Sequence, residues 1–254
     1  MNSSSTAKDD GLDAVYQYFH RMGLGLSKSR FMSIDRMVFE GYTRLEARKN
    51  RDIADETKYK ALVRRLFPAL ANESQNRIAH RANELFWKIV VDNYRLKLGA
   101  VNCLKSLQRR GLTMGIVSNH KDAASILKTL RKLGIRNYFE TVVVSAEVGV
   151  RKPNPEIFRI AISALHEKCE GAAFVGDSLE HDVLGAHQAG LTAILLRNYE
   201  PSMINKDASR VKDYASEFGI RLIIPDYVVN RLGDIPDIIS SIGKGEPDVR
   251  APRR

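Results

Sequence analysis

The sequence has few cysteines and no long apolar run. Its two cysteines, Cys103 and Cys169, fit neither the ligand spacing of a metal site nor a disulfide framework. No apolar run approaches the ~20 residues that a membrane-spanning helix needs. The opening stretch, Met1 to Thr6, is polar and lacks the apolar segment of a signal peptide. These absences argue against a disulfide-stapled secreted domain and a membrane protein, so we expect a soluble cytoplasmic protein.

Acidic residues are in deficit, because 30 Asp and Glu face 40 Lys and Arg and leave a net charge of +10. A charge of this size raises the question of nucleic-acid binding. The basic residues are scattered, however, with dense groups at 44–51, 128–132 and 250–254, and no base-reading motif with interleaved aromatic residues accompanies them. We therefore expect a solvated basic surface and disfavour nucleic acid as a partner. A basic mouth that attracts anionic substrates fits the same charge.

The first part of the chain has a helical pattern. The 254 residues, 44% of them hydrophobic, suffice for one large domain or for a core with an insert. We expect residues 1–12 to form a loop. Residues 13–97 then show helical spacing of apolar residues throughout, as at Val15 and Phe19, and no strand signal interrupts them. This block predicts an all-helical unit.

The pattern changes at residue 98, and strands alternate with helices up to residue 243. The pair Asn154-Pro155 predicts the start of one helix, with Asn as the cap and Pro at the first helical position. Such alternation predicts an α/β core with a doubly wound, Rossmann-like parallel sheet. We expect a polar, partly helical insert at 198–219 and a disordered basic tail at 244–254. The expected strands lie at 114–117, 142–144, 172–176 and 192–196, with later candidates at 222–224 and 227–229.

Three loops at the expected carboxyl ends of these strands carry polar residues, and ligands bind at such ends in open α/β sheets. Asp177 follows an apolar strand, and Asp182, about one helical turn later, begins the helix expected at 182–189. Two carboxylates without cysteine suit a hard cation such as Mg²⁺ better than zinc. The alternative is that Asp177 only caps the next helix. Ser118 with its neighbour Asn119, and Lys152, stand on the other two loops, so that the set predicts a phosphoryl-binding site.

The segments around these residues resemble three motifs of the haloacid dehalogenase (HAD) superfamily. Val117-Ser118-Asn119 resembles the second motif, and Val148-Gly149-Val150-Arg151-Lys152-Pro153 resembles the third. Val175-Gly176-Asp177-Ser178, with Asp182, resembles the fourth. The three come in the family's order over residues 98–242, and the helical block lies where the family has its helical cap.

The resemblance implies a role for each of the site residues. Ser118 would hydrogen-bond a phosphoryl oxygen, with help from Asn119. Lys152 would neutralise the charge of the phosphate and of the attacking group. Asp177 would bind Mg²⁺, and Asp182 would support the ion directly or through water.

The family's first motif is missing from the sequence. That motif is an apolar strand ending in Asp-x-Asp, whose first Asp attacks the substrate and whose second acts as general acid and base. Asp9-Asp10-Gly11-Leu12 faintly resembles its end, but the polar run before it cannot form a buried strand, and we reject the match. We expect the motif at or before Met1, on a strand between those at 114–117 and 172–176.

By this resemblance the protein is expected to be an enzyme. The function it implies is that of a Mg²⁺-dependent phosphatase of a small phosphorylated metabolite, acting through an aspartyl-phosphate intermediate. A 2-haloacid dehalogenase is one alternative, since it uses the same nucleophile without a metal. A non-catalytic HAD-like protein that binds phosphate or a partner is the other alternative, because a protein without the first motif would lack the nucleophile. The sequence selects neither a substrate nor an oligomeric state.

Overall fold

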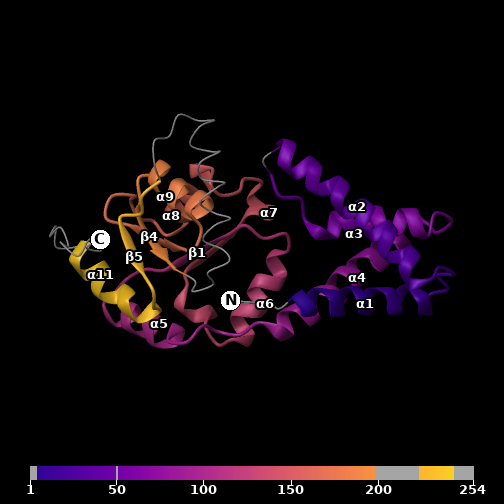
Figure 1. Ribbon diagram of the computed structural model, residues 1–254, viewed down its shortest axis with the longest axis horizontal. Helices are drawn as coiled ribbons and strands as arrows, with labels where there is room; N and C mark the ends of the chain where they lie inside the picture. The colour runs from indigo at the N-terminus through magenta and orange to yellow at the C-terminus, as the bar shows by residue number, and fades with distance from the viewer. Residues whose placement is uncertain (1–4, 50, 198–222, 243–254) are drawn as a thin grey trace. The chain divides into compact units, whose positions relative to one another are not determined.

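The computed structural model describes residues 5–49, 51–197 and 223–242 (Figure 1). It divides into two compact units. The first holds the described residues of Met1–Leu96, Asn119–Arg136 and Val144–Arg151, and the second holds those of Lys97–Ser118, Asn137–Val143 and Lys152–Arg254. The predicted fold class is confirmed, because one unit is helical and the other combines helices with parallel strands. The expected boundary between residues 97 and 98 stays a prediction.

The helical unit is built around α4, against which α1 and α3 pack, while α2 packs on α3. Its core consists of apolar residues at helical spacing, among them Val15, Phe19 and Leu62, which are fully buried. The ring of Phe19 meets that of Phe31 edge to face, with 5.9 Å between the centroids. The helical pattern of the sequence is thus confirmed. The bounds are α1 Ser5–Arg21, α2 Lys28–Lys49, α3 Asp55–Leu66, α4 Asn72–Asn93, α6 Ala123–Lys132 and α7 Ser145–Val148.

The loop predicted for residues 1–12 is wrong from Ser5 onward, where α1 begins. The packed face at the start of this helix consists of small residues, because Ala7 and Gly11 are both buried. A Cβ added at Gly11 would lie 2.9 Å from a ring carbon of Phe86 on α4. Small residues carry little hydrophobic signal, yet they let two helices approach closely. The rejection of the first-motif match at Asp9 is confirmed, since this residue lies within α1 and not at the end of a strand.

The α/β unit contains a parallel sheet in the order β3-β4-β5. The middle strand, β4, reads Thr-Ala-Ile-Leu-Leu and has three buried central residues, as expected for a strand covered on both faces. Asn154 caps α8 as predicted, because its side chain accepts a hydrogen bond from the N–H of Glu156 at 2.9 Å. The bounds of the strands are β1 Gly115–Ser118, β2 Thr141–Val144, β3 Ala173–Gly176, β4 Thr192–Leu196 and β5 Tyr227–Val229. The helices are α5 Ala100–Arg109, α8 Pro155–Ala164, α9 Leu184–Gln188 and α11 Ile235–Ile242.

The described strands form two sheets rather than one, because β1 pairs with β2 and not with β3. All four residues of β3 are only partly buried, whereas the central residues of β4 are buried. Apolar strands of a parallel sheet are normally covered and paired on both sides. The division falls between the two strands that the expected first-motif strand would separate.

Two further expectations need correction. Ile223 and Ile224 are not in a strand, because β5 begins only after Pro225, which has no N–H to donate to a ladder. The helix expected from Asp182 begins earlier, with the π-helical turn η2, Leu179–Val183, that leads into α9. The predicted insert at 198–219, the tail at 244–254 and Leu222 lie outside the described residues.

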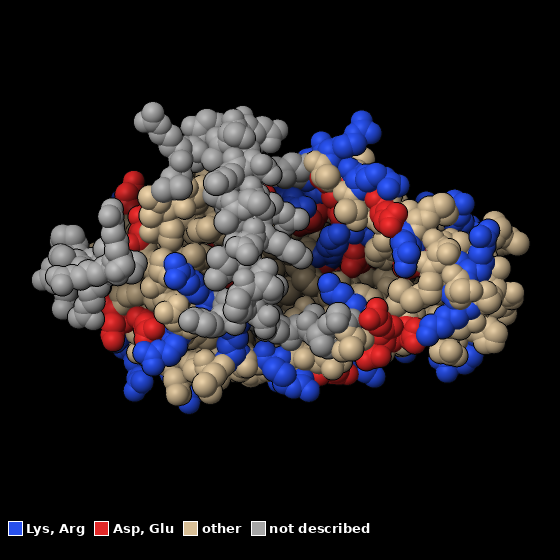
Figure 2. Space-filling model, viewed as in Figure 1, with Lys and Arg blue, Asp and Glu red and all other residues tan. Residues whose placement is uncertain are grey.

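The charged surface agrees with the scattered pattern of the sequence. In Figure 2 the Lys and Arg side chains of the described residues are spread between acidic and uncharged ones. None of the helices in residues 5–49, 51–197 and 223–242 combines the length and the apolar character needed to cross a membrane.

Candidate active site

The carboxylate of Asp182 is the anchor of the candidate site. It is 5% exposed and accepts hydrogen bonds from three donors. Lys152 Nζ lies 2.7 Å from Oδ1, and the backbone N–H groups of Asp177 and Ser178 lie 2.9 and 3.0 Å from Oδ2. One buried carboxylate thereby fixes both the lysine and the loop that follows β3.

The backbone around Asp182 explains how its side chain reaches back to this loop. The hydroxyl of Ser178 accepts the N–H of His181 at 3.1 Å and caps the π-helical turn η2, which carries Asp182. A glycine is required where β3 ends, because a Cβ at Gly176 would lie 2.3 Å from Cβ and Cγ of Asp182. π-helical turns are rare, and they are frequently found at functional sites.

Lys152 is held in place by an aromatic ring and by the packing around the segment that follows it. Its side chain is 12% exposed, and Nζ lies 5.2 Å from the centroid of Phe174 on β3. Directly after it, the carbonyl of Pro153 comes within 2.9 Å of the position that a Cβ would take on Gly185 of α9. The close approach of α9 to this segment allows little room for Lys152 to shift.

The structure brings three of the predicted site residues together: Lys152, Asp177 and Asp182. Asp177 is the exposed one of the three and follows the carboxyl end of β3, as predicted. Ser118 is the last residue of β1, in the same unit but in the other sheet, and its approach to a bound phosphate stays a prediction. The same holds for Asn119, which belongs to the helical unit.

A buried polar network in the helical unit escaped the sequence analysis. Asp52 is 4% exposed, accepts a hydrogen bond from the hydroxyl of Ser145, and pairs with Arg151 at 3.1 Å. Ser145 in turn accepts the backbone N–H of His120 at 3.0 Å. Asp52 therefore fastens the segment before Lys152 and, through Ser145, the segment after Ser118.

A second part of the network is centred on Glu46, which is 2% exposed. Its carboxylate lies 3.0 Å from Nζ of Lys58 and 2.8 Å from Nζ of Lys121, and it accepts the N–H of Ile53 at 2.9 Å. Burial alone would raise the pKa of Glu46, but these hydrogen bonds outweigh it and hold the pKa below its ordinary value. Burial lowers the pKa of Lys58, which also lies 3.2 Å from Asp55.

Close to this network, Asp35 is a buried acid with an unmet hydrogen-bonding need. It is 8% exposed, and its Oδ1 has no hydrogen-bond partner among the described residues. Burial, together with the negative charge of Asp55, raises the pKa of Asp35 from 3.8 to about 7. The charged run from Glu46 to Asp55 gives no signal in the sequence that separates these buried groups from solvated ones.

The residues of the site fit Mg²⁺ better than zinc. No group of three or more His, Cys, Asp or Glu side chains that could enclose a metal occurs within the described ranges. Mg²⁺ needs no such cage, because it keeps several waters and binds one or two carboxylates together with substrate phosphate. Asp177, exposed at the end of a strand, suits this role. Asp182 already accepts three donors, so its geometry suits an anchor of the loop better than a direct ligand.

Comparison with known families identifies the chain. A family model described as haloacid dehalogenase-like hydrolase matches residues 13–190, and a second, HAD-hydrolase-like, matches residues 149–235. The first match takes in well over half of the sequence. The chain belongs to the haloacid dehalogenase-like hydrolases, as the three motifs predict.

Individual relatives are similar over part of their length. The chain is 32% identical over 143 residues to a glyceraldehyde 3-phosphate phosphatase of Methanopyrus kandleri, covering 56% of this chain and 55% of that protein. It is 27% identical over 157 residues to a ribulose-1,5-bisphosphate 5-phosphatase of Halopiger xanaduensis, covering 62% of each. The chain thus spans little more than half the length of these curated relatives.

Among solved structures, the fold is similar to that of a 2-haloacid dehalogenase from Pseudomonas syringae. The TM-score is 0.65 at 18% sequence identity, and the match covers 93% of this chain and 92% of that one. An identity this low shows the fold alone.

Proposed function

We propose that the protein is a Mg²⁺-dependent phosphatase that acts on a small phosphorylated metabolite. The observation that carries the proposal is the joint anchoring of Lys152 and the Asp177 loop by Asp182. An ammonium group and a strand-end carboxylate, held together at one edge of a parallel sheet, suit a phosphate ester and its counter-ion. Relatives whose names are those of sugar-phosphate and triose-phosphate phosphatases support the same class of substrate.

Each residue of the site has a defined task under this proposal. Lys152 binds a phosphoryl oxygen and offsets its negative charge, and Ser118 donates a hydrogen bond to another. Asp177 holds the ion, and Asp182 keeps Lys152 and the Asp177 loop in register. When bound, Mg²⁺ withdraws negative charge from the phosphoryl group, which is the main requirement of phosphoryl transfer.

The nucleophile of the proposed reaction is the aspartate of the first motif. The family resemblance expects this aspartate at the end of a strand between β1 and β3. Transfer of the phosphoryl group to this carboxylate breaks the P–O bond to the metabolite, whose oxygen takes up a proton. Water then hydrolyses the aspartyl phosphate and releases inorganic phosphate.

The test is a hydrolysis assay on the native protein, with an aryl phosphate and a panel of phosphorylated metabolites. We expect turnover that EDTA abolishes and added Mg²⁺ restores, and that Asp177→Asn lowers at least ~100-fold. Glu180→Gln is the matched control, since it removes a neighbouring carboxylate in η2 and should retain activity.

Three other outcomes overturn the proposal. Chloride release from 2-chloropropionate without a metal would identify a dehalogenase. Binding of phosphate without turnover by the native protein would identify the non-catalytic alternative. Activity that is insensitive to both EDTA and Asp177→Asn would show that the carboxylate after β3 has another purpose.

A further inference from the structure

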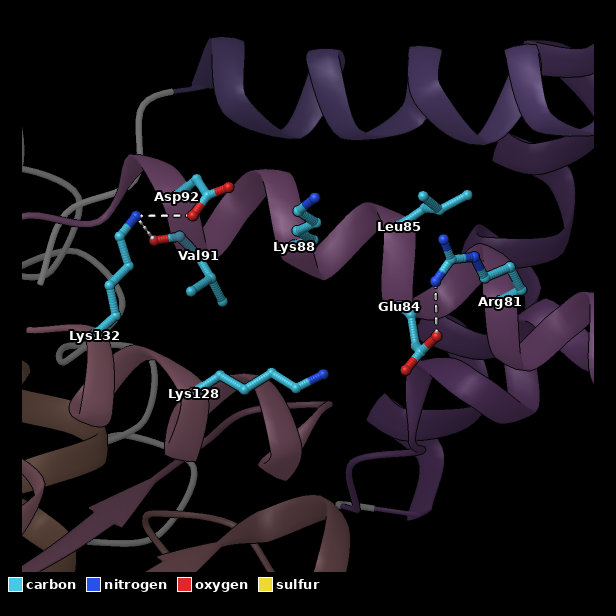
Figure 3. Close-up of a pocket in the computed structure, with 8 residues that line it drawn as sticks. All are labelled: Arg81, Glu84, Leu85, Lys88, Val91, Asp92, Lys128 and Lys132. Atoms are coloured by element: carbon cyan, nitrogen blue, oxygen red, sulfur yellow. Dashed lines mark hydrogen bonds and ion pairs between the residues drawn. The ribbon is translucent and has the colours of Figure 1, made fainter.

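A pocket of about 360 Å³ lies in the helical unit between α4 and α6, and it contains none of the site residues described above (Figure 3). Its lining is rich in cationic side chains, with four basic and two acidic residues beside the apolar Leu85 and Val91. The charged residues are Arg81, Glu84, Lys88, Asp92, Lys128 and Lys132.

Both acidic residues of the pocket are already paired with a basic neighbour. Glu84 lies 3.2 Å from Arg81, and Asp92 lies 2.9 Å from Nζ of Lys132. Figure 3 shows these two ion pairs at opposite ends of the pocket. They cancel in charge, so that the remaining charge of the lining comes from two lysines.

Those two lysines, Lys88 and Lys128, have no ion pair among the described residues, and they come from the two facing helices. Lys88 is on α4, and Lys128 extends from α6 into the space between the two ion pairs (Figure 3). Two like charges around one concavity repel each other, and a concave surface concentrates their field. An anion that carries two negative charges would balance them.

We propose that this pocket binds a small multiply charged anion of the phosphate type, such as a phosphate dianion or a pyrophosphate group. The volume suits a metabolite-sized ligand. The apolar lining residues Leu85 and Val91 offer contact to the carbon part of an organic phosphate. The shared chemistry is the phosphate group, whether it belongs to an inorganic ion or to a metabolite.

Such a ligand would bridge two helices that are already joined by a hydrogen bond from α4 to the N-cap residue of α6. Asn83 on α4 donates a hydrogen bond at 2.7 Å to Oδ2 of Asp122, and Oδ1 of Asp122 accepts the N–H of Ser125 in the first turn of α6. Binding between Lys88 and Lys128 would therefore add a second link between α4 and α6. A stabilised fold follows by linkage, since the ligand binds only the folded chain.

The experiment is calorimetric titration of the protein with inorganic pyrophosphate at low and at physiological salt. We expect binding that the double variant Lys88→Gln/Lys128→Gln weakens at least ~10-fold. The double variant Lys60→Gln/Lys105→Gln removes the same charge from one partly buried and one exposed position elsewhere and should bind like the wild type. Asp92→Asn frees Lys132 and should tighten binding instead.

A separate arm distinguishes this pocket from the candidate active site. Lys152→Gln, which removes the ammonium group beside Asp182, should leave pyrophosphate binding at the pocket in place. The readout is binding and not turnover, so that failure of the proposed phosphatase function would not affect it. The proposal is overturned if the Lys88/Lys128 variant binds like the wild type, if the Lys60/Lys105 control weakens binding equally, or if Lys152→Gln abolishes all binding.

Discussion

Replacing Lys58 with methionine isolates the contribution of the buried ion network. Lys58 is 1% exposed, and its ammonium group lies 3.0 Å from Glu46 and 3.2 Å from Asp55, which are themselves buried. Methionine has a similar length and fills most of the same space without the charge. The change therefore leaves two carboxylates in the interior with less compensation.

The expected cost follows from the partners that remain. Removing one member of a buried ion pair typically costs roughly 3–5 kcal/mol, out of a total stability of ~5–15 kcal/mol. Glu46 keeps Lys121 at 2.8 Å, so the loss falls mainly on Asp55 and the cost is expected near the low end, ~3 kcal/mol. At about 2–4 °C per kcal/mol for a chain of this size, the melting temperature should fall by roughly 6–12 °C.

The pH dependence has a definite sign. Burial already raises the pKa of Asp55 above its ordinary value, and loss of Lys58 should raise it further. A carboxyl group whose pKa is raised in the folded state loses stability as pH rises from its unfolded pKa to its folded one. The destabilisation should therefore be larger at pH 7.5 than at pH 5.

Urea unfolding of the wild type and two variants measures this effect. Lys60→Met is the matched control, since Lys60 lies on the same helix and pairs with Glu56 at 2.9 Å, but both side chains are 38% exposed. Exposed helical pairs are worth only about 0.3–0.5 kcal/mol. If Lys58→Met costs no more than Lys60→Met, the buried network does not stabilise the helical unit in the way argued.

Two further substitutions test single positions. Asp35→Asn should stabilise the protein above pH 7 by up to ~4 kcal/mol, because a pKa raised from 3.8 to about 7 penalises the charged form of the carboxyl group. This gain in stability should fade as the pH drops toward 4. Urea unfolding across this pH range measures the gain, and a gain that does not depend on pH would contradict the prediction. Gly176→Ala should lower the free energy of unfolding by roughly 1–3 kcal/mol, because the added methyl group displaces Asp182. Gly41→Ala, on the exposed face of α2 with open space around it, should raise the free energy of unfolding by about 0.5–1 kcal/mol. Thermal unfolding should show these opposite signs, and equal effects of the two variants would refute the close contact at Gly176.

Elements with strong local signals were predictable from the sequence. The pair Asn154-Pro155 marks the start of α8 by chemistry that acts within three residues, and the apolar run of β4 needs a covered position in any fold. The start of α1 was missed, because Ala7 and Gly11 bury only small surfaces, and their contribution to stability depends on a neighbouring helix. Pattern analysis weighs apolar volume and cannot detect a close approach between helices.

The candidate site was predictable in its members but not in its bonding. Lys152, Asp177 and Asp182 were identified through resemblance to family motifs, and the structure places these three together. The sequence could not show that Asp182 turns back to accept three donors, because this needs a π-helical turn. It also gave no sign of Asp52, since burial of a charge depends on segments far away in the chain.

The triple role of Asp182 as an acceptor has a mechanical consequence. Its two oxygens accept hydrogen bonds from different groups: Oδ1 from the ammonium group of Lys152, and Oδ2 from the backbone N–H groups after β3. An anion that draws the lysine away from Oδ1 leaves the carboxylate tethered through Oδ2 alone. A displacement of the Lys152 ammonium group would therefore alter the restraint on the backbone of Asp177 through this one carboxylate.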